Sequence, residues 1–104
     1  MTLKYRLPKI SLNDWYGGKH WSERSKIKNV YKLLVRGVTI NYPCEVEYDF
    51  EFKTRPLDCS NTVAMLKLIE DCLFPDDGVK IVRKLTITSR KSDKDEVTVK
   101  INKL

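Results

Sequence analysis

Residues 44–54 read CEVEYDFEFKT and contain the clearest strand pattern in this chain of 104 residues. Apolar and acidic residues alternate along the stretch, and successive side chains of a β-strand point to opposite faces. Val46, Tyr48, Phe50 and Phe52 therefore share a core-facing side. The other side carries four acidic residues, Glu45, Glu47, Asp49 and Glu51. We interpret this acidic row as a solvated strand face rather than an array of metal ligands. Because it would repel DNA, we place it away from such a substrate or against a partner.

Amphipathic helices are predicted on both sides of this strand. Residues 22–38 place apolar side chains at the i, i+3, i+4 and i+7 spacing of a helix that buries one face. Ser22 is a suitable N-cap, and Gly37 indicates the end of this helix. A second helix is expected at about residues 60–73, because Pro75 cannot continue it.

Three shorter strand patterns complete the predicted sheet. They lie at residues 3–7, 79–88 and 97–101, and a polar turn joins the last two as a hairpin. The alternation slips around residues 82–84, which predicts a bulge or a strong twist. The predicted order is β-α-β-α-β-β, and the length indicates a single domain over residues 1–104. We expect an α+β fold in which two helices pack on a four-stranded, mainly antiparallel sheet.

The composition is that of an ordinary globular protein, with 41% hydrophobic residues. No apolar run approaches the ~18 residues of a membrane span, so we expect a soluble, cytoplasmic protein without a membrane partner. The three cysteines lack the clustered spacing of a zinc site, and we expect them to be reduced and buried. Nothing in the pattern calls for a small-molecule cofactor.

Positive charge is concentrated in the first part of the chain, which has a net charge of +6 overall. Residues 1–43 contain nine Lys and Arg residues but only two acidic ones. Such a distribution attracts nucleic acid largely without regard to base sequence. Four cations recur at steps of four along the first predicted helix, namely Arg24, Lys28, Lys32 and Arg36. This stripe either contacts phosphates or is a solvated helix face.

Residues 11–21 read SLNDWYGGKHW and are predicted to form a turn-rich loop, because two adjacent glycines interrupt regular structure. Trp15, Tyr16, His20 and Trp21 are crowded into this segment. Their rings either stack on exposed bases at a branch point or pack over the end of a small core.

The segment from Asp58 to Asp77 combines acidic groups with a single lysine. Lys67 and Asp71 share the helix face opposite the core stripe, and Asp76 with Asp77 follows the helix. Carboxylates suit a hard divalent cation, and a lysine can balance charge that develops on a phosphate. Taken singly, the same residues are a helix cap, a surface i,i+4 pair and a turn. The two acidic ends meet only if the helix packs beside the following strand.

In combination these residues resemble the signature of the RusA-like endodeoxyribonucleases, which are Holliday-junction resolvases common in phages and prophages. The matching residues are Asp58, Ser60 and Asn61 at the helix start, Lys67 with Asp71 four residues later, and the pair Asp76 and Asp77. Residues 11–28 are also similar to the N-terminal part of phage members, so the resemblance spans nearly the whole chain. Two departures are Ser60, where the family prototype has Asp, and Lys67, which follows Asn61 by six residues instead of three.

The resemblance implies a homodimer that binds four-way or branched DNA and cuts it with Mg²⁺, or with Mn²⁺, in DNA recombination and repair. It implies metal-binding carboxylates at Asp58 and Asp77, with Asp76 beside them, and a catalytic lysine at Lys67. Asp71 or Asp76 would orient the attacking water. The expected nucleic-acid contacts are Arg24, Lys28, Lys32, Arg36, Lys19, His20 and Asn61. Because Ser60 removes one family acid, the alternative is a nucleic-acid-binding module of the same fold that does not cut. A third class is an interaction protein that docks through its acidic strand.

Overall fold

The computed structural model describes residues 1–17, 21–75 and 80–104, which form one four-stranded sheet and three helices. The strands are β1 (Thr2–Tyr5), β2 (Cys44–Phe52), β3 (Val82–Lys91) and β4 (Glu96–Lys103). They lie in the order β1-β4-β2-β3, where β4 is antiparallel to both neighbours and β2 is parallel to β3. The predicted α+β fold with a mainly antiparallel sheet of four strands is confirmed. The hairpin predicted between the last two strands was wrong, because β3 and β4 lie on opposite sides of β2 and do not pair with each other.

β2 is the centre of the core because its alternation leaves one face apolar. Val46, Tyr48 and Phe50 are each only 1% exposed. The rings of Tyr48, Phe50 and Phe52 stack along this face, with neighbouring centroids 6.0 and 6.2 Å apart. Residues of β4 lie opposite them in register, namely Val97, Val99 and Ile101. Burying side chains of this size stabilises the fold by roughly 1.5–3 kcal/mol each.

The predicted irregularity near residues 82–84 is present at the start of β3. Cys44 pairs with Val82, whereas Glu45 pairs with Lys84, so Arg83 is an extra residue on β3. An extra residue of this kind is a β-bulge, which bends and twists the strand. Beyond the bulge the register is regular, and it places basic residues of β3 on the same face of the sheet as the acidic row of β2.

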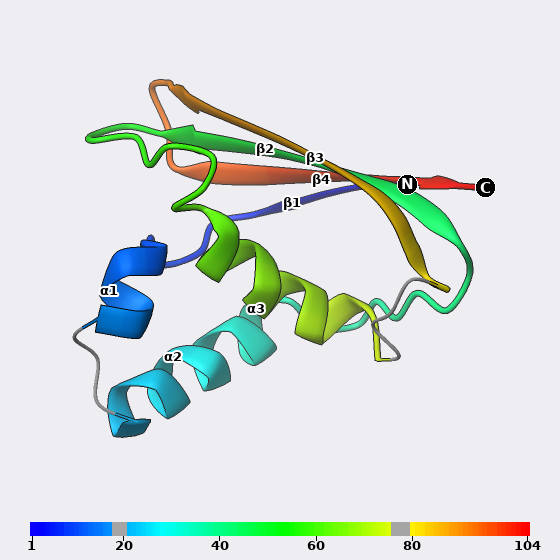
Figure 1. Ribbon diagram of the computed structural model, residues 1–104, viewed down its shortest axis with the longest axis horizontal. Coiled ribbons are helices and arrows are strands. Elements are labelled where there is room, and N and C mark those ends of the chain that lie inside the picture. The colour runs from blue at the N-terminus through cyan, green and yellow to red at the C-terminus, as the bar shows by residue number, and fades with distance from the viewer. Residues whose placement is uncertain (18–20, 76–79) are drawn as a thin grey trace.

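The two longer helices lie on one side of the sheet, as predicted. They are α2 (Trp21–Leu34) and α3 (Val63–Leu73). α3 lies next to the strands, and α2 packs against α3 farther from the sheet (Figure 1). A helix covered on more than one side needs a wide apolar surface. α3 accordingly buries six residues, namely Ala64, Met65, Leu66, Leu68, Ile69 and Leu73.

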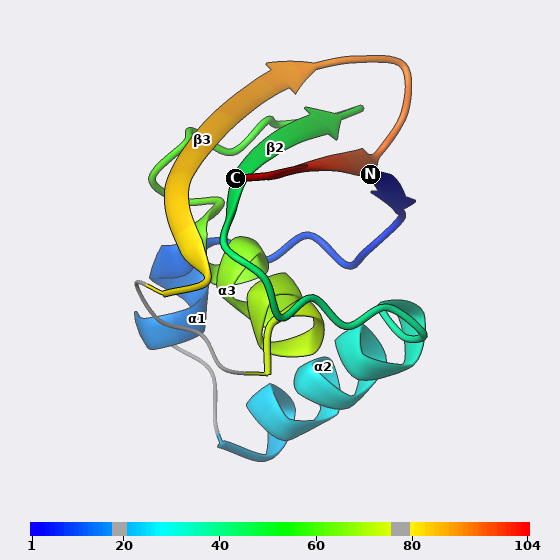
Figure 2. The ribbon, with the colours of Figure 1, turned by 90° about the vertical axis from the view of Figure 1, so that its right-hand side faces the viewer.

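A third helix, α1 (Leu12–Gly17), occupies part of the segment for which the sequence predicted a loop, and that prediction was wrong. Ser11 caps this helix, because its Oγ accepts a hydrogen bond from the Asp14 N–H at 3.0 Å. Trp15 is buried on one side of α1. The Leu12 N–H donates to the carbonyl of Asn61 at 3.0 Å, which fixes α1 to the turn before α3. α1 and α2 contact α3 on different sides (Figure 2).

The boundaries of the two predicted helices differ by a few residues. α2 begins at Trp21, one residue before the predicted cap, and ends at Leu34, earlier than expected. Gly37 has a φ of +86°, a left-handed conformation that suits glycine after a helix end. α3 begins at Val63 instead of Ser60, because residues 58–62 form a separate turn.

Two expectations about the whole chain have different outcomes. All three cysteines are free, but only Cys44 is buried; Cys72 is partly exposed and Cys59 is exposed, so the expectation of burial was wrong for Cys59. Among the helices of the described ranges, none combines the length and the apolar character needed to cross a membrane.

Candidate functional site

The turn before α3 presents Asp58 at the protein surface. Its Oδ1 accepts the Asn61 N–H at 2.8 Å, and its Oδ2 accepts the Asn61 side-chain Nδ2–H at 3.4 Å. The Asn61 N–H also reaches the Asp58 carbonyl at 3.0 Å, and the buried Thr62 donates its hydroxyl to the Cys59 carbonyl at 2.7 Å. Asp58 therefore holds the turn before α3 together, and its side chain stays exposed. It does not cap the helix itself, because the N-cap is Thr62 and has no side-chain cap hydrogen bond.

Lys67 and Asp71 lie on the exposed side of α3, as the helical spacing predicted. Within the described residues no ion pair joins them, and neither has another ionic partner there. Their charges are therefore open to solvent or to a ligand. From the start of α3, Lys67 lies about 6 Å and Asp71 about 12 Å along the helix axis, at 1.5 Å per residue.

Asp76 and Asp77 lie outside the described residues. Pro75 and Lys80, which flank them, follow the carboxyl end of α3, whereas Asp58 precedes its amino end. The helix between these ends rises about 16 Å over its 11 residues. One ion shared by Asp58 and Asp77 requires their carboxylates to approach within about 5 Å of each other. That meeting stays a prediction.

Of the predicted Mg²⁺ ligands, Asp58 alone lies within the described residues. Asp58 has the right chemistry, because a carboxylate keeps free lone pairs after accepting two hydrogen bonds and hard cations take oxygen ligands. In the described part of the chain, no three His, Cys, Asp or Glu side chains are grouped so that they could hold a metal ion. A complete cage would therefore need Asp76 or Asp77.

The cationic stripe predicted on α2 divides into two parts. Lys28, Lys32 and Arg36 are exposed, although Arg36 lies just beyond the end of the helix. Arg24 instead packs against α1, with its Cζ 5.7 Å from the ring centroid of Trp15 and 5.8 Å from that of Tyr16. Arg24 therefore supports the fold, and three cations of the stripe remain available to phosphates.

Cys72 lies on α3, and its thiol is free and partly exposed. Burial raises its pKa, the carboxylate of Asp71 raises it further, and the ammonium of Lys32 lowers it. The raised pKa keeps this thiol protonated to a higher pH than an ordinary cysteine.

The aromatic residues in and next to α1 differ in their exposure to solvent. Trp15 is 7% exposed and packs in the core, as the structural alternative predicts. Tyr16 and Trp21 are 62% and 71% exposed. These two rings are accessible to bases, whereas Lys19 and His20 lie outside the described residues.

Two of the four acids in the row of β2, Asp49 and Glu51, are paired with basic residues of β3 and of the turn that follows it. Arg90 on β3 donates two hydrogen bonds of 3.2 Å to Asp49 and a third to Glu51. The hydrogen bond and charge of Asp49 raise the pKa of Arg90, and Glu51 adds to the effect. Lys94 lies 3.7 Å from Glu51, which is only 7% exposed. The prediction of a solvated acidic face was therefore wrong at Glu51.

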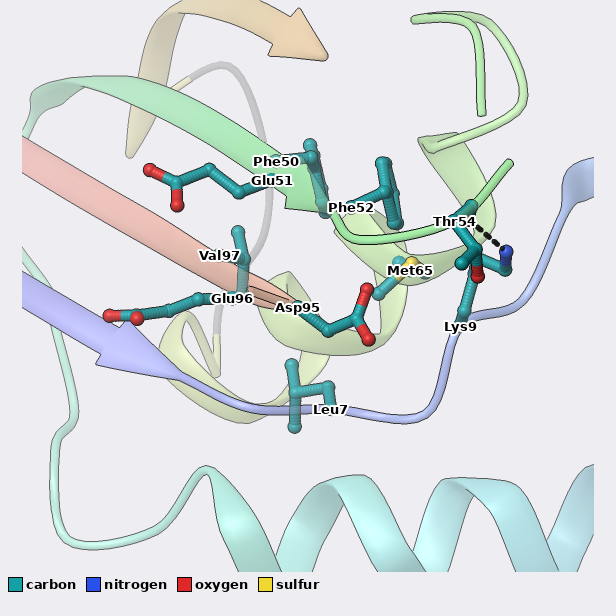
Figure 3. Close-up of a pocket in the computed structure, with 10 residues that line it drawn as sticks. All are labelled: Leu7, Lys9, Phe50, Glu51, Phe52, Thr54, Met65, Asp95, Glu96 and Val97. Atoms are coloured by element: carbon teal, nitrogen blue, oxygen red, sulfur yellow. Dashed lines mark hydrogen bonds between the residues drawn. The ribbon is translucent and has the colours of Figure 1, made fainter. Parts of the chain in front are cut away.

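A pocket of about 160 Å³ lies where β2 and β4 meet the segment between β1 and α1 (Figure 3). Its floor is apolar, with Phe50, Phe52 and Met65, and Lys9 lies at its edge. The side chains of Glu51 and Glu96 extend away from Lys9. No residue that the sequence predicted for the site lines this pocket.

Comparison of this chain with family models, curated proteins and solved structures found no match. The resemblance described above therefore depends on the residues that carry it.

Proposed function

We propose that this protein is a Mg²⁺-dependent, structure-selective endodeoxyribonuclease that acts on Holliday junctions or other branched DNA. The observation that carries the proposal is the exposed polar side of α3 and its preceding turn. Asp58, Lys67 and Asp71 are all exposed there, and Lys67 has no ionic partner within the described residues. Charges that the fold leaves unpaired are candidates for binding a ligand of opposite charge.

Each residue has a stated role in this proposal. Asp58 and Asp77, with Asp76, would hold the metal, while Lys67 would stabilise the negative charge that develops on the phosphate in the transition state. Asp71 or Asp76 would accept a hydrogen bond from the attacking water and orient it. When bound, Mg²⁺ supplies Lewis acidity and lowers the pKa of a coordinated water.

Two further surfaces support binding of branched DNA. Lys28, Lys32 and Arg36 are exposed and would contact the phosphates. The exposed rings of Tyr16 and Trp21 would stack on bases that are unpaired at a branch. Lys19, His20 and Asn61 stay predicted contacts. We place the activity in the cytoplasm, and the homodimer that the resemblance implies stays part of the proposal.

The decisive experiment compares Asp58→Asn and Asp77→Asn on a synthetic four-way junction. Asparagine at position 58 still accepts the Asn61 N–H and keeps the turn, but it removes the negative charge. Both variants are expected to lose Mg²⁺-dependent cleavage and to bind the junction as tightly as wild type or more tightly, because a repelling charge is gone. Gel-resolved cleavage products and fluorescence anisotropy measure the two properties.

The matched control is Asp93→Asn, which removes an exposed carboxylate from the turn between β3 and β4. This variant should cut as wild type does. Wild-type cleavage rates in either Asp58→Asn or Asp77→Asn would show that the assigned metal ligands are wrong.

The second candidate is a nucleic-acid-binding module of the same fold that does not cut DNA. Ser60 favours it, because a hydroxyl stands where the family prototype has a carboxylate, and Ser60 is exposed beside Asp58. Junction binding by wild type without cleavage in Mg²⁺ or Mn²⁺ would select this candidate. Restored cleavage in Ser60→Asp would identify the missing acid as the cause.

A further inference from the structure

Arg55 has a backbone conformation that arginine rarely adopts. Its φ is +48°, and it is the one residue other than glycine with a positive φ in the ranges 1–17, 21–75 and 80–104. This left-handed region suits glycine, asparagine and aspartate, whereas larger side chains are strained there. Such a residue persists only where its surroundings hold it, and strained residues are concentrated at functional sites.

Lys9 holds this part of the backbone. Its Nζ donates hydrogen bonds to the carbonyls of Thr54 and Arg55, at 2.9 and 3.2 Å, and lies 5.8 Å from the ring centroid of Phe52 (Figure 3). The charge of Lys9 is therefore directed at two backbone oxygens and an aromatic face. Lys9 itself lies on the segment between β1 and α1, far from Arg55 in the sequence.

The rest of the loop between β2 and α3 is also anchored. The Leu57 carbonyl accepts a hydrogen bond from the Ser89 hydroxyl, and the Cys59 thiol donates to the Ile87 carbonyl at 3.6 Å. The Asn61 carbonyl accepts the Leu12 N–H at 3.0 Å. Hydrogen bonds thus attach the loop to β3 and α1 on both sides of Asp58.

The guanidinium of Arg55 is free although its backbone is fixed. Its side chain is exposed and makes no hydrogen bond or ion pair with any residue that the structure describes. Arg90 shows the opposite arrangement, because its guanidinium is bound by Asp49 and Glu51. Glycine would adopt this backbone conformation with less strain than arginine. The turn alone therefore does not explain why position 55 carries an arginine side chain.

We infer that Arg55 contacts a phosphate of the nucleic-acid backbone and that Lys9 is the residue that positions it. A guanidinium binds a phosphodiester through two parallel hydrogen bonds, and a fixed backbone reduces the entropy lost on binding. The inference depends on the proposed function for its ligand, DNA, but it does not depend on cleavage. It adds a phosphate contact three residues before Asp58.

Arg55→Gly tests the inference, because it removes the guanidinium and the strain together. Junction binding is measured by fluorescence anisotropy in EDTA over a range of salt concentrations. The variant should bind about tenfold more weakly at low salt, and the slope of log K against log salt should decrease by about one. Its melting temperature should stay equal or rise by up to about 4 °C, since strain is relieved.

Arg83→Ala is the control, because it removes another exposed arginine from the bulge at the opposite end of β2. Its binding loss should be much smaller than that of Arg55→Gly. A Lys9→Met substitution should also weaken binding in the wild-type background, but it should add no loss in the Arg55→Gly background. An additive effect would show that Lys9 contacts DNA directly and would overturn its positioning role.

The outcomes separate this inference from the endonuclease proposal. If Arg55→Gly binds DNA with wild-type affinity and salt slope, the inference is overturned while cleavage is unaffected. If wild type binds but does not cut, the endonuclease proposal fails and the Arg55 contact stands. Absence of DNA binding by wild type overturns both. Inorganic phosphate at a matched concentration of phosphate groups should not displace the junction beyond its effect on ionic strength, and equal displacement would indicate a site for a free anion.

Discussion

The acidic row of β2 and the polar side of α3 both present carboxylates, but the fold treats them differently. Asp49 and Glu51 are bound by Arg90 and Lys94, and Glu51 is buried by these contacts. Asp71 and Lys67 are exposed and have no ionic partner among the described residues. The comparison teaches that charged residues stabilise the fold where a neighbouring strand or turn supplies residues of opposite charge. Charged residues without such a partner are candidates for function.

The largest expected effect is on the α3 side. Lys67→Met should lower the rate of junction cleavage by about 10²–10³-fold, because one charged contact to the transition state is lost. The melting temperature should stay near that of wild type, since Lys67 is exposed and methionine is also a good helix former. Single-turnover cleavage and thermal unfolding measure the two effects.

Lys94→Met is the converse substitution, because Lys94 lies 3.4 Å from Glu96 and 3.7 Å from Glu51. It should leave cleavage unchanged. If both lysine variants changed cleavage equally, the distinction between paired and unpaired charged residues would be wrong.

The next largest effect is a loss of stability on substitution in the acidic row of β2. Glu51→Ala should lower the free energy of unfolding by about 1–3 kcal/mol, because a buried carboxylate with several hydrogen bonds is removed. Urea denaturation measures the loss. Glu47→Ala, on the same face of the same strand, is exposed and should change stability by at most about 0.5 kcal/mol. Equal losses in the two variants would contradict a structural role specific to Glu51.

The smallest effect compares two buried tyrosines. The Tyr31 hydroxyl donates to the Pro8 carbonyl at 2.6 Å, whereas the buried Tyr48 hydroxyl has no partner within the described residues. Tyr31→Phe should therefore cost about 0.5–1.5 kcal/mol of unfolding free energy, and Tyr48→Phe should cost nothing or stabilise the protein slightly. Chemical denaturation at neutral pH measures the difference, and the reverse order would show that Tyr48 is the better satisfied residue.

The same two residues govern stability at high pH. Burial raises the pKa of both tyrosines well above the ordinary value, and Glu70 adds to the effect on Tyr48. Above about pH 10 the unfolded chain releases these phenolic protons while the folded protein keeps them, so stability falls as pH rises. Each Tyr→Phe substitution should make that fall less steep. A stability that stays constant from neutral to strongly alkaline pH would contradict this assignment.

Periodicity made most of the fold predictable. The alternation in β2, the helical spacing in α2 and the slip at Arg83 all correspond to observed features. α1 was missed because its six residues are too few for a periodic pattern and adjacent glycines dominated the interpretation. A usable signal was present, because Ser11 and Asp14 have the spacing of a helix start.

The candidate site was predictable only in part. Exposure of Lys67 and Asp71 follows from helical spacing, which is a local property. The burial of Glu51 and the contact between Arg24 and the aromatic rings depend on which strands and helices become neighbours. The backbone of Arg55 depends on a lysine 46 residues away in the sequence, which no local pattern reveals.

The strand order has a consequence for how the chain folds. β4 lies between β1 and β2, so β1 finds its hydrogen-bonding partner only in the last strand of the described chain. Contacts between residues so distant in sequence slow folding, because the entropy of closing a large loop is lost before the strand pairing contributes any stabilisation. A ribosome-bound chain that lacks β4 would leave β1 without a neighbour and β2 with only β3 beside it. We expect the sheet to be completed only after β4 has been synthesised, in a single cooperative step.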